Sequence, residues 1–530
     1  MAMGFPLYLF LLFVHLALCS SWIQGQTLPR KTTSDVNQVL GKSFDYIIVG
    51  GGTAGCPLAA TLSEKFSVLL VERGDSPYEN PLIMENKNFG LSLVQTDEHT
   101  SVAQSFVSKD GVSNLRGRVL GGGSAINGGF FSRASEDYVK RVGWNKEMVS
   151  DAYKWVESRN AFKPKLTSWD YVAELSLLEA GIFPYNGFSL DHIEGTKIGA
   201  TIYDEQGRRH TSADLLMAGN PNNITLLLNA TVTSIIFHKK GKRNETIVRG
   251  IRFIKSDGSS LQTHEAYLNT QKNLSPTGDV ILAAGALGSP QILLLSGIGP
   301  QKHLNKFDIP VAVNLKSVGK GMQDNPAIAF VPDIADSKPK NFPPDSPKVI
   351  AIADDFKLIV GSMILPINFN ATIMLISGKL AFPESEGQLE LNSTDPRKNP
   401  SVTFNYLATE KDMAECVKLG RLLEQIVRSK SIAYFLEVEG KRRNESMSTD
   451  DELRNLCKNN VKTFYHYHGG CTMGSVVDKN YRVFGVEGLR VIDGSTFLES
   501  PGTNPMATLL MLGRYQGIKI LQEREKMLKP

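Results

Sequence analysis

The sequence predicts an α/β fold built on a parallel sheet. Three observations indicate it: an apolar, β-branched run at 44–49, a glycine-rich turn directly after it, and a second apolar run at 67–71 that ends in an acidic residue. Buried parallel strands are apolar throughout rather than alternating, and a helix usually connects two of them. The order strand, glycine turn, helix, strand is therefore typical of a βαβ unit.

The glycine turn has the spacing of a dinucleotide-binding loop. Gly50, Gly52 and Gly55 form G-x-G-x-x-G between the first strand and the helix. The first glycine permits a tight turn, the second lets a pyrophosphate approach the backbone, and the third lets the helix pack on the strand. Glu72 ends the second strand, where a carboxylate accepts hydrogen bonds from a ribose. Together these features predict a Rossmann-type domain, without separating flavin from nicotinamide.

Two further glycine-rich runs indicate which of the two cofactors, flavin or nicotinamide, is bound. Residues 116–133 read RGRVLGGGSAINGGFFSR, and residues 285–299 read GALGSPQILLLSGIG. They resemble the two signatures of the glucose-methanol-choline (GMC) oxidoreductases, a family of FAD enzymes. The small residues at 121–124 let backbone lie against a flat ring system, and Asn127 can hydrogen-bond to it. A glycine-rich loop packed against its own protein is the alternative interpretation of this run alone.

Position 126 bears on how the flavin is held. In covalently flavinylated members of the family, a histidine precedes the asparagine. Here that position is Ile126. The resemblance therefore implies that FAD is bound without a covalent bond.

The C-terminal part carries the candidate catalytic residues. Residues 463–474 read TFYHYHGGCTMG, and in the family a catalytic histidine lies a fixed distance before the Cys-x-Met-Gly element, which implies His466. His468 is the alternative, because alternate side chains share one face if 464–468 is extended. Alternatively, either histidine can have only a structural role, in a buried strand where its ring is hydrogen-bonded to other protein groups. The family's second catalytic position matches Asn504 in TNPMAT.

The resemblance also implies a set of cofactor contacts. Pro505 fits the first turn of a helix whose N-terminal dipole would face the flavin pyrimidine. Asp493 and Gly494 match positions near the ribityl and pyrophosphate groups, and Val232 matches the position whose backbone recognises adenine. The residues expected to bind FAD are Gly50, Gly52, Thr53, Ala54, Gly55, Glu72, Arg118, Val119, Gly122, Gly123, Ser124, Asn127, Val232, Asp493, Gly494, Asn504, Pro505 and Met506.

The order of the motifs implies two discontinuous domains. A Rossmann-type FAD-binding domain is expected over 43–140, 208–305 and 466–524, and an α+β substrate-binding cap over 141–207 and 306–465. The segments HYHGGC, KNPSVTFNY and MLGRYQGIKI resemble the plant branch of the family, which includes HOTHEAD-like and R-mandelonitrile-lyase-like proteins.

The N-terminus has the character of a secretory signal. Residues 5–18 are mostly apolar, too short to span a bilayer well, and followed by small and polar residues. We therefore expect a signal peptide over 1–25 and a secreted protein, although 1–4 lack the usual Lys or Arg. No later run is apolar enough for a membrane anchor. The N-x-S/T sequons that secretion would expose to glycosylation begin at Asn223, Asn229, Asn244, Asn273, Asn370, Asn392 and Asn444.

The cysteines are few for a secreted chain. Cys19 would leave with the signal, Cys56 lies beside the glycine turn, and Cys471 belongs to the histidine segment. The plant members that this chain resembles carry a disulfide, and Cys416 and Cys457, on two stretches of helical pattern, are the matching pair. No metal site is expected, because neither of these two has a second Cys or His at ligand spacing.

Composition excludes some classes of protein. The chain has 42% hydrophobic and 21% charged residues, which is ordinary for a globular protein. A net charge of +4 is too small to indicate nucleic-acid binding, and the basic runs at 239–243 and 441–443 lack aromatic neighbours and are interpreted as solvated turns. The expected partner is a small-molecule alcohol or cyanohydrin, and the sequence indicates no oligomeric state.

Two functions fit these motifs. In the first, His466 takes the hydroxyl proton of an alcohol, Asn504 holds the oxygen, hydride passes to flavin N5, and an aldehyde leaves. In the second, an R-hydroxynitrile lyase on the same fold, the histidine takes the cyanohydrin proton and the flavin is never reduced. Lyase-like plant members tend to carry a second histidine where this chain has Asn504, so oxidation is favoured.

Overall fold

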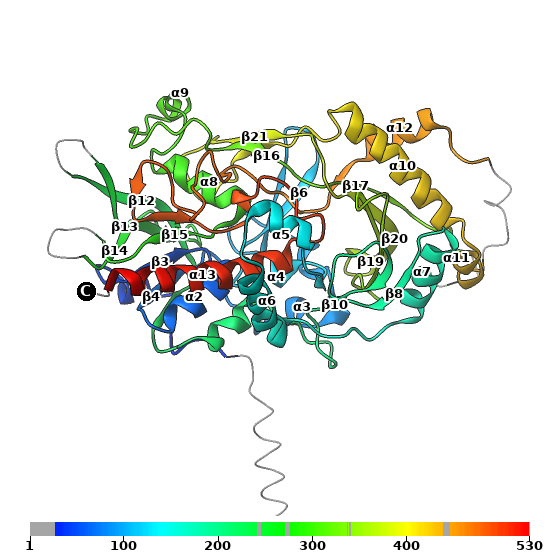
Figure 1. Cartoon of the computed structure of the whole chain (residues 1–530), viewed down its shortest axis with the longest axis horizontal. Helices are drawn as coiled ribbons and strands as arrows, with labels where there is room; N and C mark the ends of the chain where they lie inside the picture. The colour runs from blue at the N-terminus through cyan, green and yellow to red at the C-terminus, as the bar shows by residue number, and fades with distance from the viewer. Residues whose placement is uncertain are drawn as a thin grey trace, which may run out of the picture.

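Two large sheets lie at opposite ends of the molecule (Figure 1). The computed structural model describes residues 27–528 apart from 241–244, 271–275, 336–337, 339–340 and 438–445. The predicted signal peptide over 1–25, the basic run at 441–443, part of the run at 239–243, and the sequons at Asn244, Asn273 and Asn444 lie outside the described residues.

The first sheet is the predicted Rossmann sheet. Its six strands are all parallel, in the order β1–β11–β4–β3–β15–β25. Their bounds are β1 Lys31–Thr33, β11 Ile224–Leu227, β4 Val68–Val71, β3 Tyr46–Val49, β15 Val280–Leu282 and β25 Leu489–Val491. Every residue of β3 and β4 is buried, and helix α2 (Gly55–Ser63) connects them. The predicted βαβ unit is therefore confirmed.

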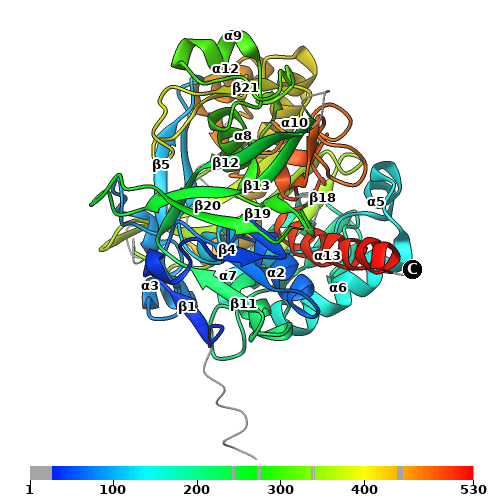
Figure 2. The ribbon, with the colours of Figure 1, turned by 90° about the vertical axis from the view of Figure 1, so that its left-hand side faces the viewer.

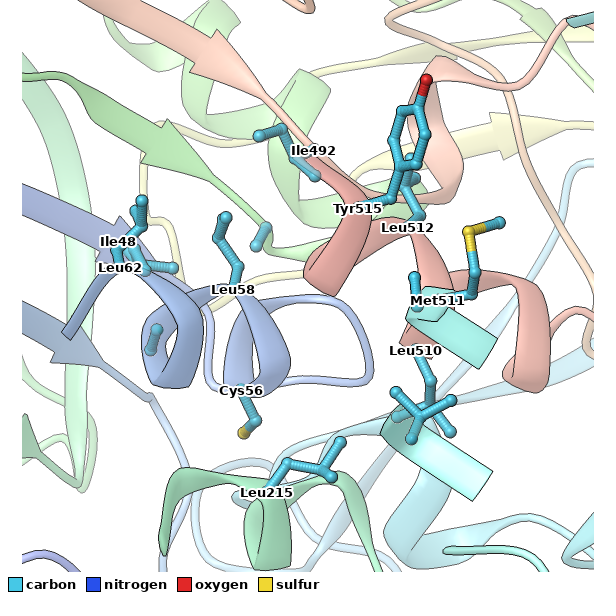
Figure 3. Close-up of a cluster of buried hydrophobic side chains, with 14 of the residues drawn as sticks. Ile48, Cys56, Leu58, Leu62, Leu215, Ile492, Leu510, Met511, Leu512 and Tyr515 are labelled. Atoms are coloured by element: carbon cyan, nitrogen blue, oxygen red, sulfur yellow. The ribbon is translucent and has the colours of Figure 1, made fainter. Parts of the chain in front are cut away.

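Helix α2 is buried along its whole length, which its small and apolar residues allow. The long C-terminal helix α13 (Met506–Leu528) packs on it, and Gly513 makes this close approach possible because a Cβ there would lie 2.2 Å from the carbonyl oxygen of Ala54. Figure 3 shows Leu62 of α2 beside Ile48 of β3, and Leu58 of α2 between them and Leu512 of α13. Each such buried leucine stabilises the fold by roughly 1.5–3 kcal/mol, so the packing of α13 on α2 stabilises the position of α13.

A second, mixed sheet extends the Rossmann side. Its strands are β12 (Ala230–Lys240), β13 (Glu245–Lys255), β14 (His264–Leu268) and β2 (Ser43–Phe44), and β24 (Val486–Glu487) pairs with β13. Figure 2 shows β12 and β13 above β4 and α2, with α13 and α6 (Lys146–Asn160) side by side on one flank. Val232 lies near the start of β12, which contacts β4.

The second large sheet forms the cap. Its order is β23–β17–β20–β19–β18–β9–β8, and its strands are β23 Lys462–Thr463, β17 Pro326–Phe330, β20 Ala371–Leu380, β19 Leu358–Asn368, β18 Val349–Ala353, β9 Gly195–Ile198 and β8 Tyr185–Phe188. Helices α7 (Ser168–Glu179) and α10 (Glu410–Val427) pack on it, and α11 (Lys430–Phe435) and α12 (Asp450–Asn460) lie against these helices. The predicted α/β fold with an α+β cap is confirmed.

The remaining elements connect these layers. They are α3 (Pro81–Met84), β5 (Ala103–Val107), β6 (Ser113–Gly117), α4 (Gly123–Ile126), β7 (Phe130–Phe131), α5 (Glu136–Val142), β10 (Ala200–Thr201), α8 (Gly285–Leu295), α9 (Gln301–Leu304), β16 (Lys320–Met322), β21 (Gly387–Glu390) and β22 (Ser401–Thr403), with short 3-10 turns η1 (Val36–Gln38), η2 (Asn86–Asn88), η3 (Leu91–Leu93), η4 (Ser212–Ala218), η5 (Asn305–Phe307) and η7 (Gly494–Thr496).

The domain division can be compared with the sheets. All strands of the Rossmann sheet except β1 fall inside 43–140, 208–305 and 466–524, and all strands of the cap sheet fall inside 141–207 and 306–465. The exact limits stay a prediction. Within the described ranges, no helix combines the length and apolar character needed to cross a bilayer.

The predicted disulfide joins two cap helices. Cys416 of α10 and Cys457 of α12 are bonded, with 6.2 Å between their Cα atoms. Both stretches are helical, as their pattern predicted. Cys56 and Cys471 are free and buried.

Candidate active site

One cavity connects the glycine turns with the histidine segment. It lies at the carboxyl ends of β3 and β4 and reaches the start of α13. The predicted cofactor-binding residues that line it are Gly50, Gly52, Thr53, Ala54, Glu72, Val119, Gly122, Gly123, Val232, Asp493, Gly494 and Pro505. His466 and His468 line it as well. The cavity thus brings together residues from all three motif regions of the sequence.

The two glycine turns pack against each other and leave no room for side chains. Gly50 has a φ of +107°, and a Cβ there would lie 2.5 Å from the carbonyl oxygen of Ala283. At Gly122, with a φ of +54°, a Cβ would lie 2.8 Å from the Cα of Gly52. Such bare backbone beside the N-terminus of α2 is the arrangement that a pyrophosphate requires. The cradle therefore fits the pyrophosphate of a dinucleotide cofactor.

Two buried carboxylates flank this cradle. Glu72 accepts hydrogen bonds from the backbone N–H groups of Gly51 (2.9 Å) and Gly74 (2.8 Å), and burial raises its pKa. Asp493 accepts from the N–H of Gly285 at 2.9 Å, and burial raises its pKa too. Each carboxylate oxygen has a second acceptor site. Glu72 therefore keeps the capacity to bind a ribose hydroxyl while it holds the glycine turn.

Several predicted contacts do not line the cavity: Gly55, Arg118, Ser124, Asn127, Asn504 and Met506. The guanidinium of Arg118 donates to the carbonyl of Ser101 at 2.8 Å and pairs with Asp97 at 3.0 Å, so it holds a neighbouring loop. Asn127 accepts from the N–H of Gly129 at 2.9 Å, and its amide lies 3.0 Å from the sulfur of Met506. Arg118 and Asn127 therefore hydrogen-bond to neighbouring protein groups.

Asn504 and Pro505 lie at the start of α13. Pro505 lies directly before the helix, and its carbonyl accepts a helical hydrogen bond from the N–H of Leu509 at 2.9 Å. This agrees with the expected position of the proline at the helix start. Asn504 is half-buried and directly precedes it.

Residues 464–468 do not form a continuous strand, so the condition for a shared strand face is not met. Tyr465 has a φ of +60°, a left-handed conformation that breaks the alternation of side chains along a strand. The hydroxyl of Thr463 accepts from the N–H of Tyr465 at 2.7 Å, and Asp324 accepts from the N–H of His466 at 2.9 Å. Side-chain hydrogen bonds therefore hold this segment as a turn. Both histidines nevertheless face one cavity.

The hydrogen bonds of the two histidines differ, and this difference distinguishes their roles where sequence spacing does not. His468 is 3% exposed, and its ring nitrogens lie 3.0 Å from the carbonyl of His466 and 3.2 Å from Oε1 of Gln323. The Nδ1 of His466 lies 3.1 Å from Nζ of Lys379, and no described residue hydrogen-bonds its Nε2. Burial lowers the pKa of both rings, that of His468 to about 4, so both are neutral near pH 7. His466 therefore has a free ring nitrogen in the cavity wall.

Sequence reasoning missed two residues of this site. Lys379 of β20 is fully buried, and burial lowers its pKa to about 7. Asp324 is 2% exposed, and burial raises its pKa to about 6 despite four hydrogen bonds. Their local sequences, SGKLA and GMQDN, are ordinary cap sequence. The one available signal is a lysine, Lys379, within an otherwise apolar strand. Nothing in the sequence identifies Asp324 as a residue of the site.

A parallel sheet with glycine turns, acidic strand ends and a histidine in the same cavity defines a dinucleotide-dependent oxidoreductase. The chain belongs to the GMC oxidoreductase family: models of that family, described as GMC oxidoreductase, match residues 44–174 and 183–327 and residues 383–513. It is thus an FAD-dependent oxidoreductase acting on CH–OH groups, as the sequence predicted.

Several plant proteins are similar to this chain over most of its length. The chain is 42% identical to Protein HOTHEAD of Arabidopsis thaliana, over 91% of this chain and 89% of that protein. It is 39% identical to sinalpyl alcohol oxidase Nec3 of Nesocodon mauritianus (91% and 89%) and 39% identical to (R)-mandelonitrile lyase 3 of Prunus serotina (91% and 86%). The solved structure of pyridoxine 4-oxidase from Mesorbium loti has the same fold, with a TM-score of 0.74 at 20% identity over 90% of this chain and 98% of that chain.

Proposed function

We propose that this protein oxidises a small-molecule alcohol to an aldehyde, with His466 as the general base. The observation that carries the proposal is the free Nε2 of His466 in the cavity, beside a His468 whose two ring nitrogens both lie near acceptors. A neutral imidazole with an open nitrogen is the form that accepts a hydroxyl proton. Asn504, which directly precedes the cavity-lining Pro505, would turn toward the cavity to hold the substrate oxygen. FAD, when bound, supplies the acceptor for the carbinol hydride at N5.

We further propose that FAD is held without a covalent bond. Ile126 ends α4 and packs with a cluster that includes Ile83 and Val119. A hydrocarbon side chain at this position has no group that can form a bond to the flavin. The backbone cradle and the two carboxylates would then provide the binding.

Secretion is also part of the proposal. It is supported by the apolar N-terminal run and by the bonded pair Cys416 and Cys457, because disulfides persist in oxidising compartments. The sequons at Asn370 and Asn392 are exposed and would be accessible there.

An R-hydroxynitrile lyase is the second candidate. It is favoured by the similarity to (R)-mandelonitrile lyase 3 and by the amine of Lys379, whose Nζ lies 3.1 Å from Nδ1 of His466. In its protonated form this amine would stabilise a leaving cyanide. Asn504, where lyase-like relatives tend to carry histidine, favours the oxidase.

The test is an anaerobic screen on purified protein. Aliphatic and aromatic primary alcohols are mixed with the enzyme, and absorbance of the oxidised flavin is followed. Bleaching by an alcohol, absent in His466→Ala, supports the oxidase. Release of cyanide from a racemic cyanohydrin without any bleaching in the alcohol series would replace it with the lyase.

A further inference from the structure

Three partners surround the buried amine of Lys379. Its Nζ lies 3.2 Å from Oδ1 of Asn325, 3.1 Å from the carbonyl oxygen of Thr503, and 3.1 Å from Nδ1 of His466. The side chain is 0% exposed. Within the described ranges, no carboxylate lies within 4 Å of it to form an ion pair. These contacts determine which protons the amine and the imidazole can carry.

Two of the three partners can only accept. The carbonyl of Thr503 has no proton to give. The amide nitrogen of Asn325 already donates to the carbonyls of Leu380 (2.8 Å) and Ala381 (3.0 Å), which fixes its oxygen as the atom facing Lys379. Lys379 therefore donates two hydrogen bonds, whatever its charge, and the contact with His466 is the one that depends on protonation.

The charge of Lys379 sets the tautomer of His466. An ammonium has three donors and no acceptor, whereas a neutral amine has two donors and one lone pair. An ammonium would donate to Nδ1 and leave the imidazole proton on Nε2, where it blocks the base. A neutral amine accepts from Nδ1–H and leaves the lone pair of Nε2 free. Two fixed acceptors and one imidazole can satisfy either form, so the burial of the amine and the absence of a carboxylate within 4 Å among the described residues decide between them.

The surroundings favour the neutral form. Burial lowers the pKa of Lys379 to about 7, and the nearby carboxylate of Asp324 opposes this effect without cancelling it. The imidazoles that interact with this lysine are those of His192, His466 and His468. Burial lowers the pKa of all three, so they are neutral near pH 7. Above neutral pH the site then holds a neutral amine beside a neutral base.

We propose that Lys379 works as a neutral amine that holds His466 in its Nδ1–H tautomer and takes over that proton when Nε2 accepts the hydroxyl proton of the substrate. The O–H electron pair stays on the substrate oxygen. One proton enters the imidazole at Nε2 and one leaves from Nδ1 to Nζ, so the ring stays neutral and the amine becomes an ammonium. This rests on the proposed role of His466, and Lys379 is a positioning residue that acts through it.

Three substitutions separate this role from a simple supply of positive charge. Lys379→Arg keeps the charge at every pH but cannot accept from Nδ1–H. Lys379→Gln is one bond shorter but offers two donors and one acceptor, like the neutral amine. Lys379→Met removes all polar atoms and serves as the packing control. If Lys379 only supplied charge, arginine would be the best replacement.

The first readout is the pH profile of anaerobic flavin reduction, measured on FAD-loaded protein. We expect the wild-type rate to fall below about pH 7, the arginine variant to lose on the order of 10²-fold at every pH, and the glutamine variant to exceed the arginine variant and lose the acid limb. An arginine variant faster than the glutamine variant overturns the proposal. If His466→Ala leaves reduction intact, the proposed function itself fails.

The second readout needs no Lys379 variant to fold. Protein labelled with ¹⁵N-histidine is studied by NMR at pH 8, and the signals of His466 are identified by their loss in His466→Asn. We expect a protonated Nδ1 and an unprotonated Nε2. A proton on Nε2 at pH 8 overturns the proposal, even if His466 proves essential.

Discussion

The backbone N–H of His466 donates to Oδ1 of Asp324 across 2.9 Å. The other oxygen of this buried carboxylate accepts from the hydroxyls of Tyr406 (2.6 Å) and Thr463 (2.5 Å). Asp324 thus fixes the backbone of the histidine, while Lys379 contacts its ring. Asp324 therefore determines the position of the imidazole, and Lys379 determines which ring nitrogen carries its proton.

Asp324→Asn tests how this carboxylate acts on Lys379. The negative charge of Asp324 raises the pKa of Lys379, so its removal lowers that pKa further. Since the ammonium forms as pH falls, we expect the acid limb of flavin reduction to move to lower pH in the variant. Stopped-flow reduction from pH 5 to 9 measures it. A limb that moves to higher pH would contradict the assignment of the limb to Lys379.

His466→Ala and His468→Ala form a matched pair from one turn of chain. Loss of a positioned general base slows reaction by roughly 10²–10⁴-fold, so we expect the first variant to lose alcohol-dependent flavin reduction and keep FAD. His468→Ala should retain appreciable activity, since its ring nitrogens bond to protein groups. Rates of flavin bleaching and the flavin-to-protein absorbance ratio check both. If His468 proves essential and His466 dispensable, then His468 is the general base and the assignment to His466 is wrong.

Gly50→Ala is expected to abolish FAD binding. The new Cβ would lie 2.5 Å from the carbonyl oxygen of Ala283, and the residue would have to keep a φ of +107°. Gly111→Ala is the control, because Gly111 also has a positive φ but no atom within 4 Å of a Cβ. Both carry backbone strain, and only the first closes the cradle. The flavin content of the purified variants decides, and a yellow Gly50→Ala protein would refute the assignment.

Denaturation of the wild-type protein should release intact FAD. Ile126 offers no group for a covalent link to the flavin. Acid precipitation, followed by chromatography of the supernatant, identifies the released compound. Flavin that stays with the precipitate would show a covalent bond at another residue. Release of NAD in place of FAD would contradict both a covalent and a non-covalent flavin.

Replacement of Cys416 and Cys457 together by serine should lower stability without loss of activity. Loss of a disulfide costs about 2–5 kcal/mol in small domains, and we expect less in this chain because both helices also pack on an extensive cap core. Thermal unfolding monitored by flavin fluorescence measures the change. Peptide mapping of unreduced wild-type protein, with either cysteine found free or joined to Cys56 or Cys471, would disprove the pairing.

The features that sequence predicted well are local. The glycine turn and Glu72 follow from strand, turn and helix signals within a short stretch, and the bonded cysteines follow from the family resemblance. The turn at Tyr465 was not predicted, because side-chain hydrogen bonds from Thr463 and Asp324 impose it rather than a glycine. A bond to Asp324 spans 142 positions of chain. Spacing rules contain no information about such partners.

Lys379 was missed for the same reason. On sequence alone, a lysine near the end of a strand is interpreted as solvent-exposed, since lysine is rarely buried. Here β20 pairs with β17 on one side and β19 on the other. The side chain of Lys379 is therefore buried, and its amine contacts the candidate site. Its role depends on Asn325 and Thr503, which come from two other parts of the chain.

The origin of these groups bears on protein engineering. Lys379 and Asp324 belong to the cap, and β23 leads from the cap sheet directly into the histidine segment, whereas the glycine cradle belongs to the Rossmann side. A cap grafted from another family member to change substrate range would therefore also replace the groups that govern the basicity of His466. A chimaera that keeps residues 323–325, 379, 406 and 463–468 from a single parent preserves these contacts, and other parts of the cap can then vary.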